Sequence, residues 1–296
     1  MQSDPLLLGV DGGGTSCRAR LAAFSGQVLG EATTGPANLR LGIRQSFAAV
    51  TSATLLCLQR AGLTRSHLPR IVACLALAGA SEPAQLAAAE ATRHPFGKAV
   101  ITTDAHAACI GAHGERDGGI VVVGTGSVGW AMLKGQSYRV GGWGLPLSDE
   151  GSGAWLGSEV LRRVLWARDG RIAWTPLLRA LFIDFNSDPH AIVRWSQHAT
   201  PRDLGAFAPR IFELAARGDA AAVELIQAAA FHIDALASRL IAVGVDRIAL
   251  VGGCAQSIKQ WLGESTTLHL VEPLGDAVQG ALRIARSAAR PHAQVA

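Results

Sequence analysis

Twice along the chain, an apolar strand-like segment runs into a turn of glycine and hydroxyl residues, and another strand-like segment follows. The first case is residues 6–11, which end at Asp11 and lead through glycines into the alternating segment 16–24. The second is residues 119–123, followed by Gly-Thr-Gly and the segment 127–133. A strand, a glycine turn and a further strand predict a hairpin. The first turn is therefore neither a Walker A loop, which needs Gly-Lys-Ser/Thr, nor a Rossmann fingerprint, which needs a helix after the glycines.

The order of the remaining segments predicts an α/β fold made of two related halves. Residues 1–115 follow the order β-β-β-α-β-α-β and then a helix, which closely matches a ribonuclease-H-like unit. Residues 116–296 open with three strands, are then mostly helical, with one helix expected over 203–217, and return to a buried strand at 247–251. We therefore expect two ribonuclease-H-like domains around a central cleft. The last helix, at 276–289, is assigned to the second domain, although it could cross back to the first.

Charge and cysteine usage exclude several classes of function. The formal net charge is +4, but Lys and Arg are scattered, without a basic stripe or interleaved aromatics, so we expect no nucleic-acid partner. The five cysteines include no C-x-x-C pair and lie in apolar or Ala-rich surroundings, which favours reduced, packed thiols. The first residues lack the basic region of a signal peptide, and no apolar stretch approaches the length of a membrane span without Gly or a charged residue. We therefore expect a cytoplasmic protein without a membrane partner.

Both glycine turns have the composition of a phosphate-binding loop. A tip without side chains lets backbone N–H groups approach phosphate oxygens, and a hydroxyl adds a donor. The candidate residues of the first turn are Gly12, Gly13, Gly14 and Thr15. Asp11 before it can hold Mg²⁺ through water. Alone, this turn is equally well explained as a tight hairpin. The same order of strand, glycine and hydroxyl residues, and strand recurs at Gly124, Thr125, Gly126 and Ser127. Two such turns facing each other could hold a polyphosphate from both sides.

With this pair of turns the chain resembles the sugar-kinase and actin-like ATPase superfamily, which implies an actin-like ATPase fold, ATP and Mg²⁺. A set of motifs in fixed order narrows the resemblance to the eukaryotic-type N-acetylglucosamine kinase family, which includes bacterial glucosamine kinases. The motifs are 11–15, Ala37-Asn38, Thr103-Asp104, 124–127, 141–144 and 149–153. Residues 10–20 and 201–203 are especially similar to the bacterial glucosamine kinases. The resemblance covers about residues 6–285.

Asp104 lies between a predicted strand and a predicted helix, which leaves two roles open. It could be the N-cap of the helix, or a carboxylate that accepts the proton of a sugar hydroxyl during phosphoryl transfer. The resemblance implies the second role, with Asp104 as the general base acting on the 6-hydroxyl. His106 follows two residues later, and we expect it to be a packed or surface histidine.

The resemblance also implies the residues that bind the sugar. They are Asn38, Asp104, Gly142, Trp143 and Asp149. An indole offers an apolar face to a pyranose, and a carboxylate can accept from adjacent hydroxyls. Turn formation would also explain Asn38, and packing in a core would explain Trp143. Gly-Trp-Gly is typical of the N-acetylglucosamine kinases, whereas the most similar glucosamine kinases depart from it.

On the nucleotide side, the resemblance implies contacts to adenosine from Gly252, Gly253 and Ala215. The two glycines follow a predicted strand, and Ala215 is expected between helices. Glycines at a helix C-cap would look the same. No Cys/His constellation has zinc spacing, so the zinc-containing sugar kinases are not indicated.

These observations predict an ATP-dependent hexosamine 6-kinase that uses Mg²⁺, with N-acetylglucosamine preferred to glucosamine and a homodimer as a family-level expectation. Its partners would be ATP and a small amino sugar. A second hypothesis with the same fold is an ATPase that activates an acyl-CoA dehydratase or reductase, but this needs cysteines placed for an iron–sulfur cluster. A third is a non-catalytic sugar sensor, against which the presence of both Asp11 and Asp104 counts.

Overall fold

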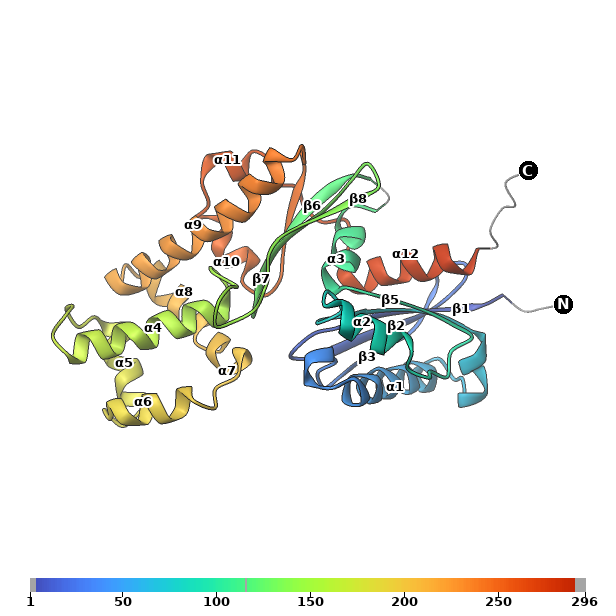
Figure 1. Ribbon diagram of the computed structural model, residues 1–296, viewed down its shortest axis with the longest axis horizontal. Coiled ribbons are helices and arrows are strands. Elements are labelled where there is room, and N and C mark those ends of the chain that lie inside the picture. The colour runs from blue at the N-terminus through green and yellow to red at the C-terminus, as the bar shows by residue number, and fades with distance from the viewer. Residues whose placement is uncertain (1–3, 115, 291–296) are drawn as a thin grey trace. The chain divides into compact units, whose positions relative to one another are not determined.

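The computed structural model describes residues 4–114 and 116–290, which form two compact units (Figure 1). Unit 1 runs up to Arg116 and resumes at Pro273, and unit 2 is Asp117–Glu272. The expected second domain, 116–296, is therefore too long. The last helix belongs with unit 1, because its apolar face packs there.

Unit 1 is built on a five-stranded mixed sheet of order β3-β2-β1-β4-β5. The strands are β1 (Leu6–Gly12), β2 (Cys17–Ala23), β3 (Val28–Thr34), β4 (Ile71–Leu77) and β5 (Lys98–Thr102). The first three strands pair antiparallel through two hairpins, whereas β1, β4 and β5 are parallel. Because parallel strands end at the same edge of a sheet, the residues after Gly12, Leu77 and Thr102 share one edge.

Helices cover both faces of this sheet. They are α1 (Ile43–Arg60), α2 (Pro83–Glu90), α3 (Asp104–His113) and α12 (Ala277–Ala289). Side chains of a strand alternate between faces, and β1 follows this rule. Leu8 and Val10 are buried in one cluster with residues of α1, whereas Leu7 is buried in another with residues of α3 and α12. Two short 3-10 helices, Leu39–Leu41 and Arg65–Arg70, complete the unit.

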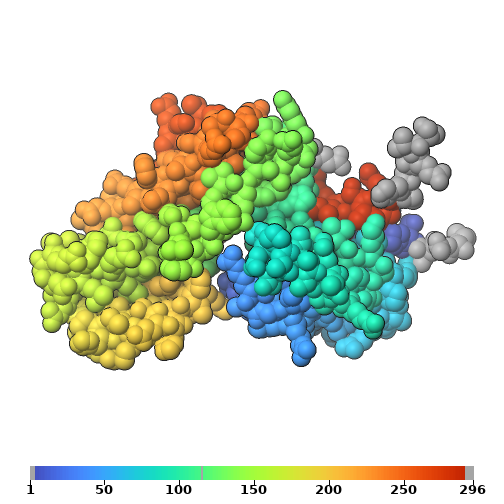
Figure 2. Space-filling model, viewed as in Figure 1, coloured from blue at the N-terminus to red at the C-terminus, as the bar shows by residue number. Residues whose placement is uncertain are grey.

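The close contact between α3 and α12 fixes the last helix in unit 1, and Figures 1 and 2 show α12 (red) beside α3 (blue-green). Glycine makes this approach possible. A Cβ at Gly280 would lie 1.8 Å from the carbonyl oxygen of Ala107, and one at Gly111 would lie 2.1 Å from that of Asp276. Strand β1 also lies close to α12, since a Cβ at Gly9 would lie 2.5 Å from the oxygen of Val278.

We therefore expect Gly280→Ala to lower the free energy of unfolding by about 2 kcal/mol, because the new methyl group forces the two helices apart. Chemical denaturation followed by circular dichroism measures this. The control is Ser287→Ala on the exposed side of the same helix, expected to stay within about 0.5 kcal/mol of the parent. Equal stabilities for the two variants would show that the helices do not meet at Gly280.

Unit 2 repeats the opening of unit 1 in a four-stranded sheet of order β8-β7-β6-β9. Its strands are β6 (Gly118–Val123), β7 (Ser127–Leu133), β8 (Gln136–Gly141) and β9 (Ile248–Val251). As in unit 1, two antiparallel hairpins lie next to a parallel neighbour. The α/β fold with a ribonuclease-H-like arrangement in each half, predicted from the sequence, is thus present in both units.

The rest of unit 2 is helical. Its helices are α4 (Gly153–Arg168), α5 (Pro176–Asp184), α6 (Pro189–Ser196), α7 (Pro201–Gly205), α8 (Ala208–Ala216), α9 (Ala220–Ala242), α10 (Ala255–Lys259) and α11 (Glu264–Thr267). The single helix expected over 203–217 is wrong, because the chain forms α7 and α8 there. Pro209 lies in the first turn of α8, where its missing N–H breaks no helical bond, whereas inside a continuous helix it would.

Among the helices that the structure describes, α9 alone has the length and composition to cross a membrane. In unit 2, however, α9 packs against other parts of the protein. Leu225, Ile226, Ala229 and Ile233 are buried in the main apolar cluster with residues of α4, α5 and α8. The apolar side of α9 is thus accounted for by the core of its own unit.

Candidate functional site

The first glycine turn joins β1 to β2 and presents unused backbone donors. The N–H of Gly13 donates to the oxygen of Ser16 (2.9 Å), and the oxygen of Gly13 accepts from Ala37 (3.0 Å), which fixes the loop. The N–H groups of Gly14 and Thr15 donate to no atom of the described residues, and both residues are exposed. Two adjacent N–H groups at an exposed tip are able to bind an anion.

The glycines of this turn differ in how much space a side chain would have. A Cβ at Gly12 would lie 2.6 Å from Leu77 Cδ2 and 2.7 Å from the oxygen of Ala37, so packing excludes a side chain. At Gly13 and Gly14 the nearest atoms would be 3.6 and 3.7 Å away, and neither residue has a positive φ. Neither crowding nor backbone strain therefore requires glycine at these two positions. The space beside them is what a phosphate group needs in order to approach the backbone.

Asp11 lies immediately before the turn, opposite Arg18 in the hairpin. Arg18 Nε and Nη2 donate to the same oxygen, Asp11 Oδ2, at 3.1 and 2.7 Å. Among the described residues, Oδ1 has no hydrogen-bond partner. One open carboxylate oxygen beside a phosphate turn fits Mg²⁺, which prefers oxygen and keeps several waters. No group of three acidic, His or Cys side chains within the described ranges could enclose a metal, so water and phosphate would supply the other ligands.

Asn38 and Asp104 lie at the same edge of the unit 1 sheet. Asn38 bridges to Ala78 just beyond β4, and its Oδ1 accepts from the N–H of Arg40 (3.0 Å). Its Nδ2 lies 3.7 Å from the Cβ position of Gly14, so the donor side of the amide is next to the first turn. The turn-forming role weighed for Asn38 is thus real, and it uses only the oxygen.

Asp104 is the first residue of α3, directly after β5. The N-cap is Thr103, whose Oγ1 accepts from the N–H of His106 (3.0 Å), so the helix-cap role considered for Asp104 is wrong. Asp104 Oδ1 accepts from the N–H of Ala105 (2.9 Å), and the helix N-terminus stabilises its negative charge. Thr102 Oγ1 lies 2.7 Å from His106 Nδ1, and burial lowers the pKa of this histidine, so it is a packed residue.

The second glycine turn, between β6 and β7, has the same open donors. Its backbone is held by Gly124 N–H to the oxygen of Gly126 (2.9 Å), and the oxygens of Gly124 and Thr125 accept from the start of α4. Within the described part of the chain, the N–H groups of Thr125 and Gly126 donate to no protein atom. Ser127 is buried, and its hydroxyl donates to the oxygen of Glu150 (2.7 Å), so this hydrogen bond stabilises the turn.

Gly252 and Gly253 lie against this second turn, because β6 and β9 end at the same edge. The N–H of Cys254 donates to the oxygen of Val123 (2.8 Å), and a Cβ at Gly252 would lie 2.6 Å from that oxygen. Gly252 also has a φ of +108°, and nothing lies within 4 Å of a Cβ at Gly253. These glycines follow a strand, so the alternative of a helix C-cap does not apply.

Ala215 does not lie between helices as expected. It is in the last turn of α8, is 5% exposed, and belongs to the core of unit 2. Its oxygen accepts from the N–H of Gly218 (3.0 Å). Only a small part of this residue is available to a ligand.

The segment after β8 contains the other candidate sugar residues, and it is tightly turned. Gly141, Gly142 and Gly144 all have positive φ, and a Cβ at Gly142 would lie 2.6 Å from Val128 Cβ. Trp143 is 69% exposed, so the interpretation of a packed core aromatic is wrong. The guanidinium of Arg139 lies 4.3 Å from the centre of its ring and also donates to the oxygens of Gly141 and Gly142.

Asp149 connects this segment to the second turn. Its Oδ1 accepts from the N–H of Gly144 (3.1 Å), and its Oδ2 lies 2.6 Å from the Cβ position of Gly126. Asp149 has a φ of +66°, which is uncommon for a residue other than glycine and tends to occur at functional sites. Unit 2 therefore brings its candidate phosphate turn and its candidate sugar segment together at one carboxylate.

Comparison with known proteins identifies the family. A model of the BadF/BadG/BcrA/BcrD ATPase family matches residues 8–285. The chain belongs to this family. As a BadF/BadG/BcrA/BcrD ATPase it uses ATP, and the resemblance to the actin-like ATPase superfamily drawn from its motifs is confirmed.

Three relatives of this BadF/BadG/BcrA/BcrD ATPase are similar over most of its length. Glucosamine kinase GspK of Vibrio cholerae serotype O1 is 41% identical over 278 residues, which are 94% of this chain and 95% of the relative. N-acetyl-D-glucosamine kinase of Dictyostelium discoideum is 27% identical over 262 residues, covering 83% and 82%. The crystal structure of a putative N-acetylglucosamine kinase from Chromobacterium violaceum has a TM-score of 0.90 at 36% identity, covering 95% of this chain and 99% of the other. The predicted two-domain actin-like fold is confirmed.

Proposed function

We propose that this ATPase is an amino-sugar kinase that transfers the γ-phosphate of ATP to the 6-hydroxyl of N-acetylglucosamine. The observation that carries the proposal is the pair of glycine turns, each with two unused backbone N–H groups at its tip. Asp104 lies at the same sheet edge as the first of them, and Asp149 touches the second. A phosphate turn beside a carboxylate in each unit suits phosphoryl transfer to a polyol.

In the proposed reaction, backbone N–H groups of the glycine turns bind phosphates of ATP, those of Gly14 and Thr15 in unit 1 and those of Thr125 and Gly126 in unit 2. Asp11 Oδ1 would hold magnesium through water, and bound magnesium would offset the charge of the phosphates. Asp104 accepts the proton of the 6-hydroxyl while the hydroxyl oxygen of the sugar bonds to the γ-phosphorus. The bond from that phosphorus to the bridging oxygen breaks, and ADP leaves.

The exposed indole favours N-acetylglucosamine over glucosamine. Trp143 offers an apolar surface to the methyl group of an acetamide, and Arg139 beside it carries a positive charge. A 2-ammonium group would be repelled by that charge, whereas an acetamide is neutral. Glucosamine is the alternative substrate, because a relative named for it is 41% identical to this chain.

The experiment is ADP release with N-acetylglucosamine, glucosamine, N-acetylmannosamine and glucose side by side. We expect the first to have the highest kcat/KM, about tenfold or more above glucosamine, with the phosphate found on the 6-oxygen by NMR. A higher kcat/KM for glucosamine would move the substrate assignment and leave the reaction unchanged. No ADP release with any amino sugar would contradict the proposed function.

Neither alternative gains support from the structure. All five cysteines lie in the described residues, and four are buried. No group of three Cys, His, Asp or Glu side chains among the described residues could hold a metal ion, and the sequence has no C-x-x-C pair for an iron–sulfur cluster. A non-catalytic sensor would have no need for Asp11 and Asp104 at the edge that carries the phosphate turn.

A further inference from the structure

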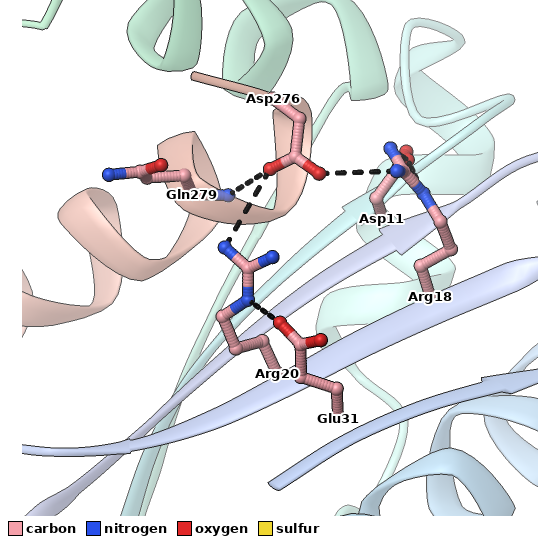
Figure 3. A network of polar contacts seen from close by, with 6 residues as sticks. All are labelled: Asp11, Arg18, Arg20, Glu31, Asp276 and Gln279. Atoms are coloured by element: carbon pink, nitrogen blue, oxygen red, sulfur yellow. Dashed lines mark hydrogen bonds and ion pairs between the residues drawn. The ribbon is translucent and has the colours of Figure 1, made fainter. Parts of the chain in front are cut away.

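The guanidinium of Arg18 lies between two carboxylates from distant parts of the chain (Figure 3). Its Nε and Nη2 donate to Asp11 Oδ2, and its Nη1 donates to Asp276 Oδ2 at 3.1 Å. Asp276 is also the N-cap of α12, since its Oδ1 accepts from the N–H of Gln279 (2.9 Å). The carboxylate of Asp276 therefore caps the last helix and also binds Arg18, which in turn binds Asp11.

A second arginine completes the network. Arg20 is two residues from Arg18 on β2 and therefore on the same face of the sheet. Arg20 pairs with Glu31 of β3, and its Nη1 is 3.9 Å from Asp276 Oδ1. Figure 3 shows Asp276 with Arg18 on one side and Arg20 on the other.

The way in which Arg18 meets Asp11 has a consequence for the metal. An arginine and a carboxylate often pair as two forks, which occupies both carboxylate oxygens. Here both bonds go to Oδ2, and Nη1 is taken by Asp276. The third contact holds the guanidinium in an orientation that leaves Oδ1 of Asp11 open. Without it, Arg18 could rotate into the fork and cover both oxygens.

We propose that Asp276 is a positioning residue for Asp11, which acts through Arg18 to keep Oδ1 available to magnesium. The inference rests on the proposed role of Asp11. It adds that the start of α12, which lies next to the point where the chain re-enters unit 1 at Pro273, sets the metal affinity of a residue on β1. Asp276 has no contact with substrate in this role.

The test is Asp276→Asn, because asparagine caps a helix about as well as aspartate and the change removes only the charge. We expect the Mg²⁺ concentration that half-saturates ADP binding to rise about tenfold, as for other residues that orient a metal ligand. Titration calorimetry of ADP at a series of Mg²⁺ concentrations, and in EDTA, measures this without turnover. The melting temperature should stay within about 2 °C.

Three further variants serve as controls for this result. Glu31→Gln removes the outer carboxylate of the network and leaves Arg18 and Asp11 untouched, so we expect its Mg²⁺ requirement to match the parent. Asp276→Ser also caps a helix and lacks the charge, so it should reproduce the effect of Asp276→Asn even if the latter folds poorly. Asp11→Asn marks the full loss of the metal contribution.

The possible outcomes distinguish the positioning role of Asp276 from the metal role of Asp11 and from the kinase activity. An unchanged Mg²⁺ requirement in both Asp276→Asn and Asp276→Ser, with a clear loss in Asp11→Asn, would overturn the positioning role and leave Asp11 as the metal residue. Equal ADP binding in Mg²⁺ and EDTA for the parent protein would remove the metal role of Asp11 and the positioning role with it. Metal-dependent ADP binding without any sugar phosphorylation would contradict only the proposed kinase activity.

Discussion

Replacing Asp104 with asparagine is expected to lower kcat for the sugar about a thousandfold, within the range that general-base catalysis contributes. Asparagine has the size of aspartate and can still accept from the N–H of Ala105, so the start of α3 is kept. It cannot take a proton from the 6-hydroxyl. We therefore expect the sugar dissociation constant to change by less than about tenfold, because ground-state hydrogen bonds are largely retained.

The matched control is the neighbouring cap residue. Thr103→Ala removes the bond from Oγ1 to the N–H of His106 and should lower the free energy of unfolding by about 1 kcal/mol. Its kcat should fall far less than that of Asp104→Asn. Single-turnover kinetics gives the chemical step and calorimetry the sugar affinity. If Asp104→Asn retained kcat within about tenfold, another group would have to be the base.

The strands and the two turns could be predicted from the sequence because their signals are local. Apolar runs end at glycine, and alternating residues resume after it, so the hairpins follow from residues that are neighbours in the chain. The pairing of Asp11 with Arg18 could be predicted in the same way from the hairpin register. The break at Pro209 also had a local signal, which the apolar pattern of 203–217 concealed.

Other features depend on interactions that no local pattern contains. Thr103 and Asp104 are both good N-cap residues, and a helix start is fixed only when the backbone N–H groups find their acceptor. Asp276 and Arg18 are 258 residues apart, so only the packing of α12 against the sheet brings them together. The exposure of Trp143 likewise depends on the positive φ angles around it.

Replacing Gly14 with alanine is expected to lower kcat/KM for ATP at least about a hundredfold without harming the fold. Its φ is not positive, and the nearest atom to the added Cβ would be 3.7 Å away, so the folded protein has room for the methyl group. Alanine also restricts the unfolded chain, so stability should be equal or slightly higher. The methyl group would stand where a phosphate must approach the open N–H groups, and small displacements of a reacting group have large effects on rate.

Two other glycines make the test specific. Gly12→Ala places its Cβ 2.6 Å from Leu77 Cδ2, so it should lose about 1 to 3 kcal/mol of stability. Gly35→Ala has nothing within 4 Å of the new Cβ and should change neither property. Thermal unfolding and the KM for ATP, measured on all three variants, separate packing from ligand approach. If Gly14→Ala used ATP as well as Gly35→Ala does, the open space at the first turn would not be a phosphate site.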